Sequence, residues 1–250
     1  MSRLFLVCLA GGVSLLVLFG ATRPAEALAK FGEPEFTCVS FKQRAAATYS
    51  ISAFGAWAEW ERKQDDARRD HRLAKAGARL AWVFDLAEAW SAHKGVDCVE
   101  QTLAAADLED RIRALVDEVA TAINTGLDLE DRRDAKCGEK LLKAAGKRSR
   151  TSLIAESLHT WPVPHGGAAR WRKWLREYAE RSFGRNWKRA RCPTDADEDV
   201  VAARLDALSR DVVFHTTVAP GLDATEFQPI SPVGSIDYQG QGILTHLPDC

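Results

Sequence analysis

The residues of this chain best suited to chemistry are the arginines, lysines and aromatics between residues 168 and 192. Guanidinium and ammonium groups interleaved with indole and phenol rings can bind phosphates, bases or lipid headgroups. Seven of the basic residues are candidate contacts for an anionic ligand: Arg170, Arg172, Lys173, Arg176, Arg185, Lys188 and Arg189. Residues 132–191 hold 17 basic and five acidic residues, although the whole chain has a formal net charge of -1. The sequence therefore predicts a local electropositive surface.

The aromatic residues of this segment also fit a structural role. Trp171, Trp174, Leu175 and Tyr178 recur at the spacing of a buried helix face. We therefore expect these rings to pack against partner helices rather than to stack on a ligand. The acidic residues at 195–199 and in 216–250 would neutralise part of the basic surface.

No stretch of the sequence spells out a catalytic motif. His159 and His165 flank a Pro/Gly-rich breaker at 161–167, but no third ligand is near in sequence, so no metal site is predicted. Ser91 and Lys94 match a Ser-x-x-Lys spacing without that motif's companions. The chain has no phosphate-binding glycine loop, no His-Glu-x-x-His and no Cys-x-x-Cys. We expect no cofactor and no catalytic residue, and the balance favours a protein that is not an enzyme.

The elements that position these residues are predicted to be helices. Apolar residues recur at steps of three and four within 46–60, 73–90 and 108–123, and helical stretches follow within 137–158, 168–192 and 201–212. We expect residues 61–70 to form a charged connector and Asp107 to cap the third helix. The predicted fold class is all-α, with two tandem disulfide-closed three-helix units and an irregular Pro/Gly-rich C-terminal tail.

The second half of the chain repeats the order of the first. Each unit has a cysteine that opens its first helix and a cysteine that follows its second. Ala58-Glu59 matches Ala155-Glu156 near the end of helix one, and residues 115–119 match residues 204–208 in helix three. Two unrelated hairpins with the same cysteine layout are the alternative. The predicted boundaries are a signal peptide at 1–29, the two units at 30–126 and 127–215, and the tail at 216–250.

Cysteine spacing predicts one disulfide in each unit. Antiparallel helices of similar length bring the start of one beside the end of the next, which favours Cys38 with Cys98 and Cys137 with Cys192. Four cysteines alone allow three connectivities, so other pairings stay open. Cys250 is left over as a free thiol, as the bridge of a disulfide-linked homodimer, or as half of a disulfide with a partner.

The first 29 residues are typical of a secretory signal. Arg3 precedes an apolar run from 4 to 19, and Ala27-Leu28-Ala29 forms a small-x-small cleavage site. An uncleaved membrane anchor is the alternative, because residues 4–21 just reach the length that spans a bilayer. No later apolar run approaches that length, so we expect no transmembrane segment in the mature chain. With its paired cysteines, the protein is predicted to be secreted or periplasmic.

The segment Cys137-Gly138-Glu139-Lys140-Leu141-Leu142-Lys143-Ala144-Ala145-Gly146-Lys147 precedes a Trp/Lys-rich helix, a cysteine, an acidic stretch and an aliphatic helix with an inner Asp. This arrangement resembles tandem cysteine-closed helical repeats of secreted bacterial proteins of uncharacterised function. The resemblance covers about residues 38–214. It implies an all-helical repeat fold and brings no activity, cofactor or catalytic residue. The first unit departs from the pattern, with Phe41-Lys42-Gln43-Arg44-Ala45 in place of the lysine-rich run.

Three functions are therefore weighed. The preferred expectation is a secreted or periplasmic non-enzymatic protein that acts as a binding or structural module. The second is peripheral attachment to an anionic surface or polymer through the basic 132–191 segment. The third is an uncharacterised hydrolase whose site is assembled from His159, His165 and the tail around Asp237.

Overall fold

The computed structural model describes residues 34–96, 98, 103–158 and 167–216. In these residues the chain forms α-helices and no strand, as the all-α prediction requires. The helices are α3 (Pro34–Lys63), α4 (Asp66–His93), α5 (Ala105–Asn124), α6 (Arg132–Ser157), α7 (Gly167–Ala190) and α8 (Glu198–Thr216). The predicted signal segment, His159, His165 and the C-terminal tail with Asp237 and Cys250 lie outside the described residues.

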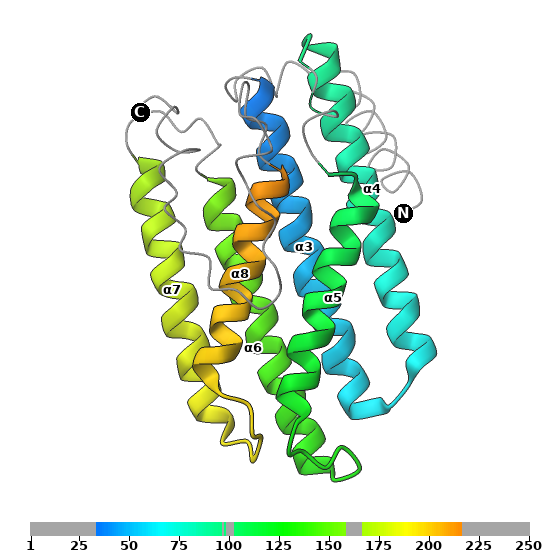
Figure 1. The fold of residues 1–250 in the computed structure, drawn as a ribbon, viewed down its shortest axis with the longest axis vertical. Helices are drawn as coiled ribbons and strands as arrows, with labels where there is room; N and C mark the ends of the chain where they lie inside the picture. Colours follow the sequence, from blue (N-terminus) through cyan, green and yellow to red (C-terminus); the bar gives the residue numbers. More distant parts are fainter. Residues whose placement is uncertain (1–33, 97, 99–102, 159–166, 217–250) are drawn as a thin grey trace, which may run out of the picture. The chain divides into compact units, whose positions relative to one another are not determined.

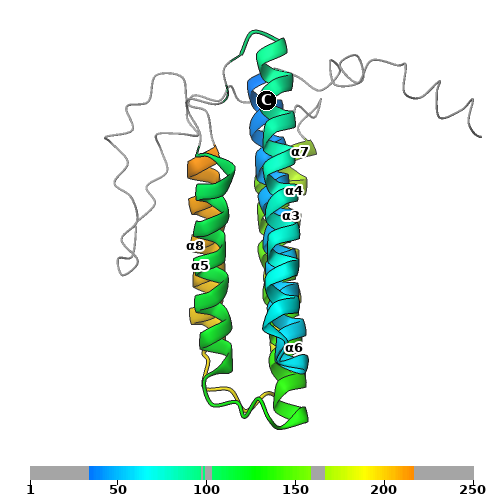
Figure 2. The same ribbon diagram turned by 90° about the vertical axis from the view of Figure 1, so that its right-hand side faces the viewer.

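The described helices form two layers (Figures 1 and 2). In the first layer α4, α3, α6 and α7 lie side by side in that order, and α5 and α8 cover α3 and α6 from one side. Because α3 and α6 each contact helices on both sides and in the second layer, they are the central elements. α4 and α7 are the edge helices of the first layer.

The centre of the fold is the contact between α3 and α6, which run antiparallel and approach closely at small residues. A Cβ added at Gly146 of α6 would lie 2.8 Å from the Cβ of Phe54 in α3. At the same crossing the hydroxyls of Ser50 and Ser149 share a buried hydrogen bond of 2.6 Å. Ser50 follows Cys38 by 12 residues, and Ser149 follows Cys137 by 12. Residues at about the same place in the first helix of each unit therefore meet, which indicates an approximate twofold relation between the units.

One hydrophobic core joins the two units. Its buried side chains include Phe54 of α3, Ile112 of α5, Leu142 of α6 and Leu205 of α8. Neither unit covers its apolar faces alone, because the first helix of each unit packs against the first helix of the other. The stability of each unit therefore depends on the other unit.

The two predicted disulfides are confirmed. Cys38 is joined to Cys98 and Cys137 to Cys192, with sequence separations of 60 and 55 residues. Both first cysteines lie near the start of their helix, and α3 and α6 run antiparallel, so the bridges lie at opposite ends of the helices. Each bridge links the first helix of a unit to the segment after its second helix. On the chain-entropy model each contributes about 4 kcal/mol.

Two local predictions are wrong. The expected connector at 61–70 is almost entirely helical, because α3 continues to Lys63 and α4 begins at Asp66. Asp65 caps α4 by accepting a hydrogen bond of 2.9 Å from the backbone N–H of Arg68. Asp107 does not cap α5, which begins after Ala104 without a side-chain cap. Asp107 lies instead in the first turn, where a carboxylate still interacts favourably with the helix dipole.

Candidate anion-binding surface

Charge is segregated between the helices of the two layers. α6 and α7 together carry 16 basic and five acidic residues, whereas α5 and α8 carry four basic and nine acidic residues. The chain therefore has a basic side at α6 and α7 and an acidic side at α5 and α8, although its net charge is close to zero. An anionic partner would be attracted to α6 and α7 and repelled by α5 and α8.

The basic residues of α6 form one exposed stripe. Its members recur at steps of four and three: Lys136, Lys140, Lys143, Lys147 and Arg150. At the rise of an α-helix this stripe is about 21 Å long. The stripe points away from the second layer, since the buried Arg148 on another side of α6 donates to Asp206 of α8 at 2.9 Å. Of these five side chains, only Lys143 forms an ion pair with a described residue, with Glu139 at 2.5 Å.

α7 packs on α6 through a narrow apolar stripe. Ala179 and Phe183 are buried in this contact, and Leu175 and Trp187 are half-buried beside them. The guanidinium of Arg148 lies 5.2 Å from the centre of the Phe183 ring, which links the stripe to the core. Because α7 is an edge helix, most of its circumference faces away from the other described helices (Figure 1).

The expectation that the remaining aromatics of α7 are buried is wrong. Trp171, Trp174 and Tyr178 are 58%, 46% and 43% exposed. The three rings contact one another instead. Trp171 packs edge-on against Trp174 and Trp174 stacks on Tyr178, with 5.5 Å between the ring centroids in each pair. Their helical spacing predicts a core stripe, but an edge helix buries only one stripe, and Leu175, Ala179, Phe183 and Trp187 fill it.

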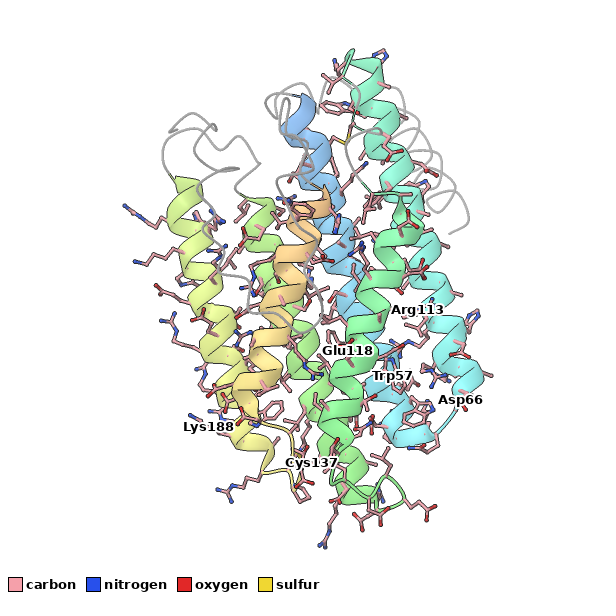
Figure 3. All side chains as sticks on the ribbon, in the orientation of Figure 1. Trp57, Asp66, Arg113, Glu118, Cys137 and Lys188 are labelled. Carbon is pink, nitrogen blue, oxygen red and sulfur yellow. A yellow bond between two sulfur atoms is a disulfide. The ribbon has the colours of Figure 1, made fainter. Side chains whose placement is uncertain are left out.

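Two of the predicted ligand contacts are bound within the molecule. Arg172 and Arg176 both donate to the carboxylate of Glu156 in α6, the first at 2.6 Å. The other five predicted contacts are exposed and form no ion pair with a described residue: Arg170, Lys173, Arg185, Lys188 and Arg189. Lys188 points away from the neighbouring helices in Figure 3. We call these five residues and the α6 stripe the basic surface.

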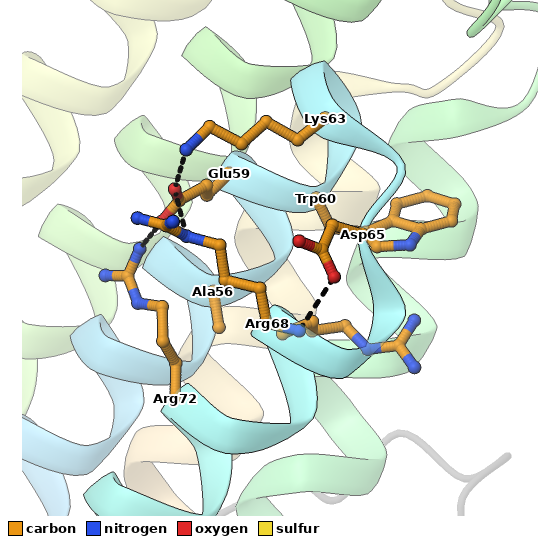
Figure 4. A pocket seen from close by; sticks show the side chains of 8 residues that line it. Ala56, Glu59, Trp60, Lys63, Asp65, Arg68 and Arg72 are labelled. Atoms are coloured by element: carbon orange, nitrogen blue, oxygen red, sulfur yellow. Dashed lines mark hydrogen bonds and ion pairs between the residues drawn. The ribbon is translucent and has the colours of Figure 1, made fainter.

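Glu156 has a counterpart in the first unit that sequence spacing alone did not reveal as an ion-pair centre. Glu59 of α3 binds Arg68 and Arg72 of α4, and Lys63 as well (Figure 4). The hydrogen bond from Lys63, together with the two arginines, lowers the pKa of Glu59 to about 2. These described side chains pack together without room for a water molecule between them.

The two clusters follow one plan. In each unit a glutamate near the end of the first helix binds two arginines four residues apart near the start of the second helix. Glu59 and Glu156 are the residues that the sequence aligns between the units. Asp117 and Asp206, also aligned, each accept a hydrogen bond from the first helix of their own unit, from Trp57 and Arg148. These shared contacts support an internal duplication.

A groove lies between α3 and α4. This groove has a volume of about 210 Å³ and is lined by Phe41, Arg44, Ala45, Thr48, Tyr49, Ser52, Ala76, Arg79, Leu80 and Val83. Its apolar walls and two guanidinium groups suit a small ligand with an apolar body and a negative charge. Burial raises the pKa of Tyr49 to about 12, so its phenol is neutral at physiological pH.

One buried carboxyl group lies where α3, α5 and α6 meet. Glu61 is fully buried, and its Oε1 accepts a hydrogen bond of 2.6 Å from Asn124 Nδ2. Glu61 Oε2 and Asn124 Oδ1 form no hydrogen bond with a described residue. A Cβ added at Gly138 would lie 3.1 Å from that Oε2, so α6 approaches the pair closely. Burial raises the pKa of Glu61 to about 7.

In the described part of the chain, the side chains that could ligate a metal are dispersed. No three His, Cys, Asp or Glu side chains within it lie close enough to hold a metal ion. Ser91 is buried and donates to the carbonyl of Glu88 at 3.0 Å. Over the same ranges, no helix is long and apolar enough to cross a membrane.

Comparisons with family models, with curated proteins and with solved structures each find no match. The resemblance to secreted tandem helical repeats therefore stays a prediction that rests on the sequence.

Proposed function

We propose that this protein is a binding module that attaches to an anionic surface or polymer through its basic surface. The observation that carries the proposal is the exposed stripe of α6. Lys136, Lys140, Lys147 and Arg150 form no ion pair with any described residue, although nine acidic residues lie on α5 and α8. Like charges held this close repel one another, and an anionic partner would relieve that repulsion.

The stripe is held by rigid elements. α6 is fixed along its length by α3, α7 and α8, and Cys137 near its start is bonded to Cys192. Cations held in fixed positions lose less conformational entropy on binding than cations on a mobile loop. The basic surface is therefore preorganised for a partner with regularly spaced negative charges.

The compartment that we propose is extracellular or periplasmic. Disulfides persist in oxidising compartments, and both disulfides here join segments 55 or more residues apart. The predicted signal at residues 1–29 agrees with this proposal.

Binding of heparin at several salt concentrations tests the proposed function. The double variant Lys140→Glu, Lys147→Glu reverses two charges of the stripe, and Lys75→Glu, Arg210→Glu makes the same change in net charge on α4 and α8. All four side chains are exposed, so both variants should fold. We expect the first variant to bind heparin at least about tenfold more weakly and with a smaller salt slope, since fewer cations engage the polyanion. Equal losses in the two variants, or no salt-dependent binding by the native protein, would contradict the proposal.

A further inference from the structure

The aromatic side chains of α7 form a small continuous patch on the free side of an edge helix. Trp171, Trp174 and Tyr178 occupy the first half of α7, and their rings contact one another in series. Each ring is more than 40% exposed. None of the three rings is needed in the α6–α7 contact, which is filled by the apolar positions from Leu175 to Trp187. The patch therefore leaves apolar area in water that a partner would cover.

The arrangement of the rings distinguishes between partners. A protein that stacks bases or sugars needs open ring faces. Here the Trp174 and Tyr178 rings are nearly parallel, with an interplanar angle of 16°, and Trp171 meets Trp174 edge-on. The facing sides of these rings cover each other, so the patch presents a joined apolar surface with an indole N–H or a hydroxyl on each ring. Such amphipathic rings favour the headgroup level of a lipid bilayer.

Cations surround the patch. Arg170 lies before the patch and Lys173 lies within it, and both are exposed. Arg181 follows the patch and is exposed, although it pairs with Glu177 at 3.5 Å. Arg176 is half exposed even while it pairs with Glu156. Helices with aromatic residues beside arginine and lysine bind at the interface of anionic bilayers, where ring insertion and phosphate attraction add together.

The patch also lies on the same side of the first layer as the α6 stripe. Gly184 of α7 faces Glu198 of α8, because a Cβ there would lie 2.8 Å from the Glu198 carboxylate. Tyr178 lies about 120° around the helix from Gly184, on the side away from α8. Trp171 and Arg185, each seven residues from Tyr178, share approximately that side. One flat membrane surface can therefore contact the rings and the lysine stripe together.

We propose that the protein docks on anionic phospholipid bilayers, with Trp171, Trp174 and Tyr178 at headgroup level and the basic surface against the phosphates. This inference rests on the proposed function and names the partner of that surface.

Vesicle binding by the processed protein tests this inference. Sedimentation is measured with phosphatidylcholine vesicles that contain phosphatidylglycerol and with phosphatidylcholine vesicles alone. The variant Trp171→Ser, Trp174→Ser, Tyr178→Ser is compared with Trp82→Ser, which removes an exposed tryptophan, 62% exposed, from the other edge helix. We expect the triple variant to bind anionic vesicles at least about tenfold more weakly. Trp82→Ser should bind like the native protein, and brominated lipids should quench native tryptophan fluorescence but not that of the triple variant.

Heparin binding by the same proteins separates the two proposals. The triple variant keeps its cations, so we expect it to bind heparin nearly as well as the native protein. Native protein that binds heparin but not anionic vesicles would overturn membrane docking and leave the proposed function intact. Equal vesicle binding by the triple variant and the native protein, or binding that does not require phosphatidylglycerol, would also overturn it. Failure of the native protein to bind either probe would overturn both proposals.

Discussion

Replacement of Glu61 by Gln should change how the stability of the bundle depends on pH. Glu61 is fully buried beside Asn124, and Gly138 brings α6 against it, so its charged form is strongly disfavoured. Burial raises its pKa from 4.5 to about 7. A glutamine at this position is neutral at every pH, keeps an acceptor for Asn124 Nδ2, and gains an N–H donor next to Asn124 Oδ1.

The sign of the effect follows from proton linkage. Below pH 4.5 both the folded and the unfolded chain hold the proton, so this group does not reduce stability. Between pH 4.5 and 7 the unfolded chain releases the proton while the folded chain keeps it, and the free energy of unfolding falls as pH rises. A pKa difference of this size lowers the free energy of unfolding by about 3 kcal/mol in total. The loss is complete above pH 7, and Glu61→Gln should not show it.

Urea unfolding of both proteins from pH 4 to 8 measures this difference. The free energy of unfolding of Glu61→Gln, minus that of the native protein, should increase by about 3 kcal/mol from pH 4 to pH 8. Glu59→Gln is the matched control two residues away. The pKa of Glu59 in the native protein is lowered to about 2, so this carboxylate contributes stability above pH 4.5 that is lost as pH falls toward 2. A difference between Glu61→Gln and the native protein that stays constant from pH 4 to 8 would refute the reasoning.

Three further predictions concern stability and are checked by urea unfolding at neutral pH. Gly146→Ala should destabilise the protein by about 1–3 kcal/mol, because the new Cβ meets Phe54 at 2.8 Å; an unchanged midpoint would mean that α3 and α6 can separate there. Asp206→Ala should cost on the order of 3 kcal/mol, because it leaves the buried guanidinium of Arg148 without its carboxylate. Replacing both cysteines of the second disulfide by Ser should cost about 4 kcal/mol, and a loss below about 1 kcal/mol would show that the unfolded chain is already compact.

Local patterns in the sequence were sufficient to predict the helices and the disulfides. Steps of three and four residues, and the helical stretches that follow them, indicate each described helix. A cysteine at the start of one helix and after the next favours the pairing that the structure shows, although it leaves the other two connectivities open. The ends of the helices were less well predicted, as at Asp65, because charged residues suit both a connector and the first turn of a helix. Ala104, which precedes α5 without a side-chain cap, gives no signal at all.

The arrangement of the helices in two layers could not be predicted from the same patterns. An amphipathic period shows that a helix has a buried stripe, but it does not show whether the helix lies at an edge or in the centre. For this reason the spacing of Trp171, Trp174 and Tyr178 predicts that they lie in the core, although their helix buries a different stripe. The pairing of Arg172 and Arg176 with Glu156 likewise depends on a contact between two helices. The alignment of Glu59 with Glu156 indicates that the two glutamates are equivalent, but it does not indicate which arginines they bind.

Lysine acetylation, followed by mass spectrometry, tests the central claim most directly, because the labelled positions report which cations a polyanion covers. Lys136, Lys140, Lys147 and Lys188 lie on the basic surface, whereas Lys75 is exposed on α4. With saturating heparin we predict that the first four become protected while Lys75 is labelled as in the free protein. Uniform protection of all five, or protection of Lys75 alone, would contradict binding through α6 and α7.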